Sequence, residues 1–547
     1  MRSLLVFLLL VSFPARVKPQ ASAEERVKVK VRIGEKQTPD GSMMPFRVIH
    51  PTPNNYVVLR SPDFDQKAFT KKSPRLDSYE GTKLLFQRSL EPVLERRGQE
   101  RLLLEDLVVM DRKPTLIART GGQEEIALYY QQVEPNITRQ GPAFERICAF
   151  PVEVKGRKAM YEHAGNSTRV RWSTATASDS SHLLIHSPEL RGASDEQPFY
   201  LLAMVDKRMQ VKWQHIMRVS GGSERSEVLD AAVDAAGNAY LLIRYRYRDG
   251  APGGGAADYE VVLHKVDADD IARIPFNMDA GYFATGGLLQ PLGKEKLAYA
   301  GIYADGSSKH GNFLTFIDST GSGLTQPVLF PFGENDELGD QERLGIAETK
   351  ADATAKNEKQ EQKRLFPTTD LLALIPKADG GYYLVNEVAL EARWINPESA
   401  RLYQRFYHGP LQARSVGKDG NVQWTSMLRR WYMSDDPTMG RAFPLSFDDQ
   451  LYIFLWDSDA NVEARKSGGK ILPKSTTSGT YSAYAYFDAK GGYRTKAVLR
   501  NGTDEALMTG WELVRTGPGE YMAFGTRSAI DVEYLPVRIE LTKETKK

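Results

Sequence analysis

Short apolar and aromatic runs, separated by tight polar turns, recur along most of the chain. In residues 228–248 (VLDAAVDAAGNAYLLIRYRYR), an apolar run is followed by a turn at 234–238 and by a second run that begins at Tyr240. Gly237 and Asn238 tolerate the positive φ that a short hairpin turn needs. The flanking runs are rich in Val, Leu, Ile and Tyr, which suit a pleated sheet. This stretch therefore predicts a β-hairpin.

Two classes of such hairpins alternate along the chain. Turns of the first class lie between apolar runs at 51–55, 110–114, 177–181, 234–238, 292–296, 377–381, 446–450 and 516–520. Turns of the second class lie at 206–210, 267–271, 318–323, 418–421 and 488–492. Two hairpins per unit give four strands, which make one blade of a β-propeller. The pattern predicts an all-β fold, a β-propeller of seven to eight four-stranded blades, with eight favoured.

Two local motifs support this interpretation. DAAGNAY at 234–240 resembles the turn of bacterial secreted propeller repeats, including the NHL-like ones. KDGNVQW at 418–424, and more loosely DKRMQVKW at 206–213, is similar to the outer hairpin of pyrroloquinoline-quinone-type propellers. Each resemblance covers fewer than ten residues, so it implies the fold and carries no activity.

The N-terminal strand has a particular place in this prediction. Residues 26–33 (RVKVKVRI) alternate between basic and apolar positions, which is typical of a half-exposed strand. The last unit of the chain supplies only three good strands, the third at 532–541. A ring left open there exposes a sheet edge. We therefore expect 26–33 to pair beside 532–541 and close the ring, with the following side chains inward: Val27, Val29, Val31 and Ile33.

Two segments depart from the strand pattern. Residues 90–105 (LEPVLERRGQERLLLE) have helical spacing and strong helix formers, which predicts a minor helix. Residues 333–365 contain few large apolar side chains and many charges, which indicates a solvated insertion between two blades. This insertion either binds a partner or is a tolerated surface loop, and the second interpretation is favoured.

The first 23 residues have the features of a signal peptide. Arg2 precedes the apolar core LLVFLLLVSF at 4–13, and Ala21-Ser22-Ala23 fits a cleavage site. We predict cleavage near Ala23, a single propeller domain over 24–547, and a bacterial protein that is periplasmic or secreted. The core is too short to span a bilayer, and no later stretch is long enough, so no transmembrane helix is expected.

The charge balance and the cysteine content limit the classes of partner and the covalent cross-links that this chain can have. The chain has 72 Lys and Arg against 70 Asp and Glu, and without residues 1–23 its net charge changes from +2 to −1. Such a protein has no general electrostatic attraction to nucleic acid. The lone cysteine, Cys148, excludes a disulfide within the chain and lies in an apolar stretch, as a small core residue does.

Two groups of residues are candidates for ligand binding. Arg244, Arg246 and Arg248 alternate with Ile243, Tyr245 and Tyr247, so three guanidinium groups share one face of a strand and can bind an acidic ligand. The alternative is that they pair with nearby carboxylates. Aromatic residues that follow can form platforms for sugars or can fill the gaps between blades. The candidates among them are Trp394, Tyr407 and Trp431.

No metal site and no cofactor are predicted. His182 and His186 are four residues apart on a predicted strand, about 13 Å, which is too far to share one ion. Residues 457–461 (DSDAN) begin like a calcium loop, but Val462 and Gly468 replace the glycine and glutamate of an EF-hand. A looser calcium site in a loop stays open.

No catalytic motif is present: the sequence has no G-x-S-x-G, no P-loop and no G-x-G-x-x-G after a strand. Propeller enzymes assemble their sites from distant blades, so the sequence leaves enzyme activity undecided. It favours a non-catalytic binding module for a protein or glycan ligand at the channel face. The alternatives are a glycan-active hydrolase or lyase and a cell-envelope scaffold or assembly factor.

Overall fold

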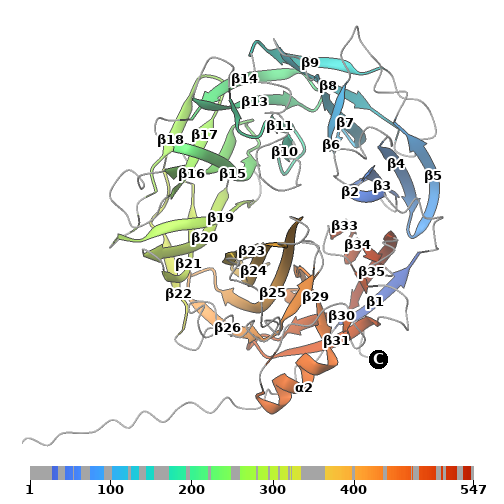
Figure 1. Ribbon diagram of the computed structural model, residues 1–547, viewed down its shortest axis with the longest axis vertical. Coiled ribbons are helices and arrows are strands. Elements are labelled where there is room, and N and C mark those ends of the chain that lie inside the picture. The colour runs from blue at the N-terminus through green and yellow to red at the C-terminus, as the bar shows by residue number, and fades with distance from the viewer. Residues whose placement is uncertain are drawn as a thin grey trace, which may run out of the picture.

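Eight β-sheets follow one another around a ring in the computed structural model (Figure 1). The structure describes residues 27–543 except for the segments 35–42, 53–54, 63–73, 91–101, 121–124, 135–142, 153–171, 192–196, 220–222, 248–258, 277, 279–280, 293–295, 306–307, 318–320, 322, 334–363, 397–400, 435–439, 470, 472–479, 501–506, 509–512 and 527–533. The all-β propeller that the hairpin pattern predicts is confirmed, with eight blades.

Each blade is an antiparallel sheet in which consecutive strands pair with each other. Blade 1 consists of β2 (Met43–Thr52), β3 (Asn55–Pro62), β4 (Arg75–Glu80) and β5 (Lys83–Ser89), and blade 2 of β6 (Leu103–Met110), β7 (Lys113–Arg119), β8 (Ile126–Gln132) and β9 (Glu145–Phe150). Blade 3 consists of β10 (Ser173–Thr176), β11 (His182–His186), β13 (Pro198–Asp206) and β14 (Val211–Arg218), with the short β12 (Leu190–Arg191). Blade 4 consists of β15 (Ser223–Val233), β16 (Ala239–Tyr247), β17 (Tyr259–Val266) and β18 (Ile271–Ile274).

Blades 5 to 8 repeat this arrangement. Blade 5 consists of β19 (Phe283–Pro291), β20 (Leu297–Asp305), β21 (Ser308–Phe316) and β22 (Val328–Pro331), and blade 6 of β23 (Arg364–Pro376), β24 (Tyr382–Asn396), β25 (Arg401–Val416) and β26 (Val422–Leu428), with the short β27 (Tyr432–Ser434). Blade 7 consists of β28 (Phe443–Phe447), β29 (Gln450–Ser458), β30 (Thr480–Phe487) and β31 (Tyr493–Arg500). Blade 8 consists of β33 (Val514–Gly517), β34 (Glu520–Thr526), β35 (Tyr534–Lys543) and β1 (Val27–Ile33), with the short β32 (Leu507–Met508). The first strand of each blade is the innermost and surrounds the axis of the ring (Figure 1).

The two ends of the chain close the ring in blade 8. β1 pairs antiparallel with β35, in a register that runs from Val27 opposite Lys543 to Ile33 opposite Val537. Val27 is 1% exposed, and the other apolar side chains of β1 pack against the cluster between blades 7 and 8. Lys28, Lys30 and Arg32 are exposed. The predicted closure and its inward and outward alternation are therefore both confirmed.

The turns of both hairpin classes lie on one face of the ring. In the 234–238 turn, the Asp234 carboxylate accepts hydrogen bonds from the backbone of Ala236 and Asn238, both at 2.9 Å, and Gly237 has φ of +86°. Asp206 accepts from the Gln210 backbone at 3.0 Å in a turn of the second class. Since these turns join strands one to two and three to four of a blade, the remaining connections lie on the opposite face. The charged segment 333–365 includes one of those connections, of which 334–363 lie outside the described residues. Its last two residues, Arg364 and Leu365, instead begin β23.

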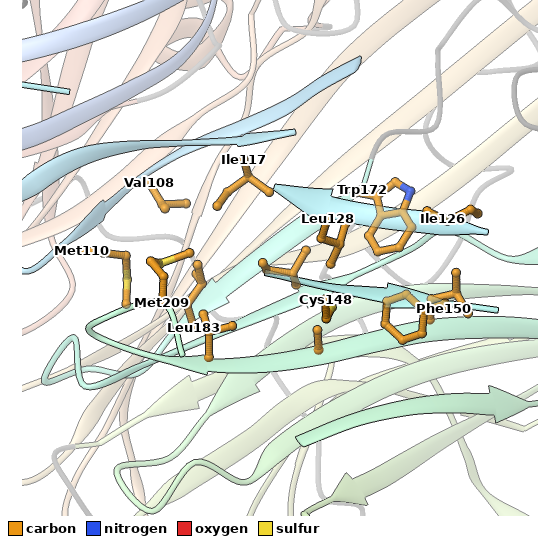
Figure 2. Packing of buried hydrophobic residues seen from close by; sticks show 14 of the residues in the cluster. Val108, Met110, Ile117, Ile126, Leu128, Cys148, Phe150, Trp172, Leu183 and Met209 are labelled. Atoms are coloured by element: carbon orange, nitrogen blue, oxygen red, sulfur yellow. The ribbon is translucent and has the colours of Figure 1, made fainter. Parts of the chain in front are cut away.

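The apolar core is divided among the eight interfaces between neighbouring blades. In the interface of blades 2 and 3, Ile117, Leu128 and Cys148 of one sheet face Leu183 of the next (Figure 2). Burial raises the pKa of the Cys148 thiol to about 12. A thiol that stays protonated near neutral pH is a poor nucleophile, which fits the predicted packing role.

Aspartates of two innermost strands tie neighbouring blades together. Asp106 of β6 accepts hydrogen bonds from Arg47 of blade 1 at 2.8 Å and from the Thr174 hydroxyl of blade 3 at 2.7 Å. Asp230 of β15 accepts from the Leu289 backbone of blade 5 at 2.7 Å. Each aspartate follows a bulge in its strand, which turns the carboxylate toward the next blade.

The prediction of a helix at 90–105 is wrong at its C-terminal end, where Leu103–Glu105 form the start of β6. Residues 91–101 lie outside the described part of the structure. The described helix is α2 (Asp459–Ser467), between the second and third strands of blade 7. The Ser458 hydroxyl accepts from the Asn461 backbone at its N-terminus, and Gly468 ends it with φ of 68°. No described helix is long and apolar enough to cross a membrane.

Candidate ligand-binding site

The arginines of β16 lie on the side of their strand that faces blade 5. A Cβ on Gly286 of β19 would lie 3.6 Å from the Arg244 guanidinium. Tyr245 and Tyr247 point the other way and are buried in the cluster between blades 3 and 4, so the alternation along this strand is as predicted. Arg246 is exposed, and Arg248 lies outside the described residues.

The sheet register adds an arginine that the sequence reasoning missed. Arg225 of β15 lies directly opposite Arg246 of β16 in the antiparallel pair, and both side chains are exposed. Arg225 occurs in the mixed stretch SERSE, between two glutamates, which gave no indication of a cationic site. Its position beside Arg246 depends on the bulge between Ser223 and Arg225.

Arg244 is the most enclosed of these arginines, with a side chain 25% exposed. It forms an ion pair with Glu227 at 3.2 Å, and its guanidinium lies 5.5 Å from the centre of the Tyr259 ring. Its Nε atom is buried and has no hydrogen-bond partner among the described residues. Arg225, Arg244 and Arg246, which we call the arginine cluster, therefore have one carboxylate partner in the described part of the structure.

The predicted aromatic residues lie elsewhere. Tyr407 and Trp431 are 3% and 7% exposed and pack with Val388 and Leu390 of blade 6 and with Ile471, which follows α2 in blade 7. This burial fits the gap-filling role that the sequence left open. Trp394 is on β24, where its backbone is opposite Tyr403, and its side chain lies outside the described residues.

A hollow of about 300 Å³ opens on the wall around the axis, at blades 6 to 8. Its lining comes from the innermost strands β23 and β28 and from the start of blade 8. The lining residues are Leu372, Ala373, Arg441, Ala442, Phe443, Pro444, Leu445, Leu513 and Tyr521. They are scattered over 150 positions of the chain, so no local sequence pattern could group them. One guanidinium in an apolar hollow is suited to a ligand with an apolar surface and a polar or acidic edge.

Arg430 fixes the start of the segment 441–445, which lines one side of the hollow. It is completely buried and donates to the backbone carbonyls of Gly440 at 2.9 Å and Gly409 at 3.2 Å, and to the Glu387 carboxylate. Burial alone would raise the pKa of Glu387, but the nearby charges of His408 and Arg430 outweigh it and lower that pKa. The carbonyl of Gly440 immediately precedes Arg441, so this buried pair fixes one edge of the hollow.

Residues considered for metal binding are engaged in local structure. The Asp457 carboxylate is bound by Arg465 of α2, and the Ser458 hydroxyl caps that helix, so neither group is free to bind calcium in this conformation. His182 contacts Ser181, with 2.8 Å between its Nδ1 and the hydroxyl oxygen. Among the described residues, no group of three or more His, Cys, Asp or Glu side chains is placed to hold a metal ion.

Comparison with known proteins gives no family. No family model matches the chain, and no curated protein matches it in sequence. Among solved structures, the chain is similar to a protein of unknown function from Dyadobacter fermentans DSM 18053, at 8% identity and a TM-score of 0.32 over 95% of this chain and 100% of that one.

Two enzymes are similar at the same low level. An ulvan lyase of family PL25 has 10% identity and a TM-score of 0.34, over 78% of this chain and 89% of that one. A puromycin hydrolase mutant has 11% identity and a TM-score of 0.32, over 76% of this chain and 50% of that one. Similarities this distant assign no activity to the present chain.

Proposed function

We propose that this protein is an exported propeller that binds a protein or glycan ligand, without catalysis, at the wall around its axis. The observation that carries the proposal is the hollow of about 300 Å³, whose lining is apolar or aromatic except for Arg441. Binding sites are commonly concave and mostly apolar, with a few polar groups that orient the ligand.

The state of the buried carboxylates supports binding over catalysis. Asp106 is bound by Arg47, Glu105 by Arg119, and Glu387 by Arg430. Asp77 and Asp457 are likewise bound by arginines. A general acid or base needs a carboxyl group that can reach the substrate and exchange its proton. Carboxylates held by arginines between strands serve the structure instead.

One residue favours the alternative of a glycan hydrolase or lyase. Burial raises the pKa of Asp230 on the innermost strand β15, although two backbone N–H groups bind it. A raised carboxyl pKa is what a general acid requires. Incubation of the mature protein with acidic and neutral glycans, followed by product analysis, decides between the two. The binding proposal expects no cleavage, and cleavage that Asp230→Asn abolishes would establish the enzyme.

The binding proposal is tested by filling the hollow. In a thermal-shift screen against glycans and candidate protein ligands, a ligand present at 100 times its Kd stabilises the native state by about 2.7 kcal/mol. Ala373→Phe places a ring in the hollow and should remove that shift. Val422→Phe, on the outer strand β26 of the same blade where Val422 is 45% exposed, is the matched control and should retain it. Equal shifts in both variants would contradict the proposed site.

Export remains a proposal from residues 1–23, which lie outside the described part of the structure. It expects the protein in the periplasm or medium, with an N-terminus near Glu24. N-terminal sequencing of the recovered protein measures this. An intact Met1 start in cytosolic protein would contradict export without bearing on ligand binding.

A further inference from the structure

The pairing of Arg225 with Arg246 is unfavourable in the protein alone. Directly opposite residues of an antiparallel pair lie about 4.5–5.5 Å apart at Cβ, and like charges there destabilise the sheet. Within the described part of the structure, neither arginine forms an ion pair or a hydrogen bond through its side chain. A bound anion would convert this repulsion into two attractive contacts.

Arg244 extends the same surface. It lies two residues from Arg246 on β16, about 7 Å away along the strand and on the same face. Glu227 supplies one negative charge for the three guanidinium groups of the arginine cluster, and its own side chain is 53% exposed. The cluster therefore offers donors in the fork geometry that binds carboxylate or sulfate oxygens bidentately.

An aromatic pair borders the arginine cluster on the side of blade 5. Tyr259 and Phe283 are both half-buried, with ring centres 6.0 Å apart and an angle of 81° between the rings. Gly286 has no side chain to cover Arg244 at the same place. β16 and β19 belong to neighbouring blades, at the left of Figure 1. The site thus combines positive charge with a partly exposed apolar edge.

We propose that the arginine cluster binds the carboxylate or sulfate group of an acidic saccharide. A uronic acid or a sulfated sugar joins an oxyanion to a flat ring with an apolar face, which matches guanidinium groups beside aromatic rings. An acidic peptide offers carboxylates without that ring. The inference goes beyond the proposed function: it assigns a second site at blades 4 and 5, away from the hollow at blades 6 to 8, with a glycan as the ligand and an acid as its anchoring group.

The first test measures binding of polymers to the mature protein by calorimetry. Polygalacturonate carries carboxylates, dextran sulfate carries sulfates, dextran is neutral, and polyglutamate is an acidic peptide. We expect one or both acidic polysaccharides to bind, with an affinity that falls as salt rises, and dextran not to bind. The two acidic polysaccharides distinguish carboxylate from sulfate. Polyglutamate binding as tightly as they do, or no binding of either, overturns the proposal.

The second test uses a variant that keeps the fold. Arg246→Glu creates an ion pair with Arg225 in place of the repulsion, so the melting temperature should rise by about 1 °C. Binding of the acidic polysaccharide should weaken at least about tenfold, since the substitution removes a charge-assisted hydrogen bond and places a negative charge beside the acid. Arg208→Glu, in an exposed turn on the opposite face, is the matched control and should bind normally.

The hollow variant separates this inference from the proposed site. Unchanged affinity in Arg246→Glu overturns the arginine proposal, and loss of binding in Ala373→Phe then leaves the hollow as the site. Loss in Arg246→Glu with normal binding in Ala373→Phe supports the arginine cluster as the site of the acidic polysaccharide, whatever ligand the hollow binds.

Discussion

At the scale of single residues, buried arginine–carboxylate pairs link the strands at the inner part of the ring. Arg430 is 0% exposed and Glu387 is 2% exposed, and Arg430 also donates to the Trp456 carbonyl of blade 7 at 3.3 Å. Removing water from two charges costs free energy, which their mutual attraction offsets only while both are present. Such pairs contribute little net stability, but they make the arrangement of blades 6 and 7 sensitive to either partner.

Replacing one partner of the Arg430–Glu387 pair should strongly destabilise the folded state. Arg430→Met leaves the Glu387 carboxylate buried without its closest ion-pair partner, and we expect a loss of about 3–5 kcal/mol in the free energy of unfolding. Chemical denaturation measures it. Lys466→Met breaks an exposed ion pair with Glu463 and should cost less than about 1 kcal/mol. Equal losses in the two variants would contradict the structural role of Arg430.

The same pair predicts a dependence on pH. The folded-state pKa of Glu387 is lowered, so its ionised form stabilises the fold above the unfolded pKa of about 4.5, and this contribution is lost as pH falls through the folded pKa. The difference in unfolding free energy between wild type and Glu387→Gln should therefore be largest near neutral pH and shrink below about pH 4. A difference that is constant from pH 7 to 3 would show that Glu387 does not titrate in this way.

At the scale of elements, β1 and α2 are attached to the propeller by different kinds of interaction. β1 pairs along its full length with β35 and covers the sheet edge that blade 8 would otherwise expose. α2 is fixed on β29 by the buried pair of Arg465 with Asp457, whose carboxylate is 0% exposed. The first element depends on main-chain pairing, and the second on one pair of side chains and a cap.

Removal of β1 should open the ring. Full burial of an aliphatic side chain such as Val27 is worth about 1.5–3 kcal/mol, and three half-buried side chains add to it. Deleting residues 24–34 from the mature protein should lower its melting temperature sharply or cause aggregation through the exposed edge of β35. Thermal melts and light scattering measure both effects. Replacing Lys28 and Lys30 with glutamine leaves the apolar side of β1 intact and serves as the control, and a truncated protein that melts with the full one would contradict closure.

At the scale of the whole molecule, the two faces of the ring differ in their connections. One face carries the tight turns of the hairpins. The other carries the connections between the second and third strands of each blade, such as α2, and the connections between blades, such as the segment 333–365. The arginine cluster lies at the ends of β15 and β16 away from the 234–238 turn, so it belongs to the face with the longer connections. Long connections of this kind tolerate changes in length and commonly carry binding residues in proteins.

The segment 333–365 should contribute little to stability. Its composition is charged and poor in large apolar residues, which limits the surface that it can bury. Replacement by a short Gly/Ser linker should change the melting temperature little, because loop closure depends weakly on length. Limited proteolysis should cut the wild-type protein there first. A large drop in melting temperature on replacement would show that the segment packs against the blades.

Much of the fold could be predicted because its signals are local. The turn at 234–238 combines Asp234, Gly237 and Asn238 within five residues, and β1 alternates in a period of two. Less of the candidate site could be predicted from the sequence. Arg244 and Arg246 were found from their strand, whereas Arg225 needed the register and bulge of the neighbouring strand. The segment DSDAN was ambiguous because Asp and Ser oxygens serve equally as helix caps and as calcium ligands.

The blades follow from local sequence signals, since hairpin turns and side-chain alternation depend on φ, ψ and polarity within some twenty residues. The sequence also implied the closure, because a leftover strand and an open edge require each other. Which polar groups meet depends on the packing of the whole ring: Arg430 with Glu387, Asp106 between three blades, and Arg225 opposite Arg246. These contacts depend on how twisted sheets from distant parts of the chain pack at their edges. A one-residue change of register would exchange every side chain that faces the neighbouring blade.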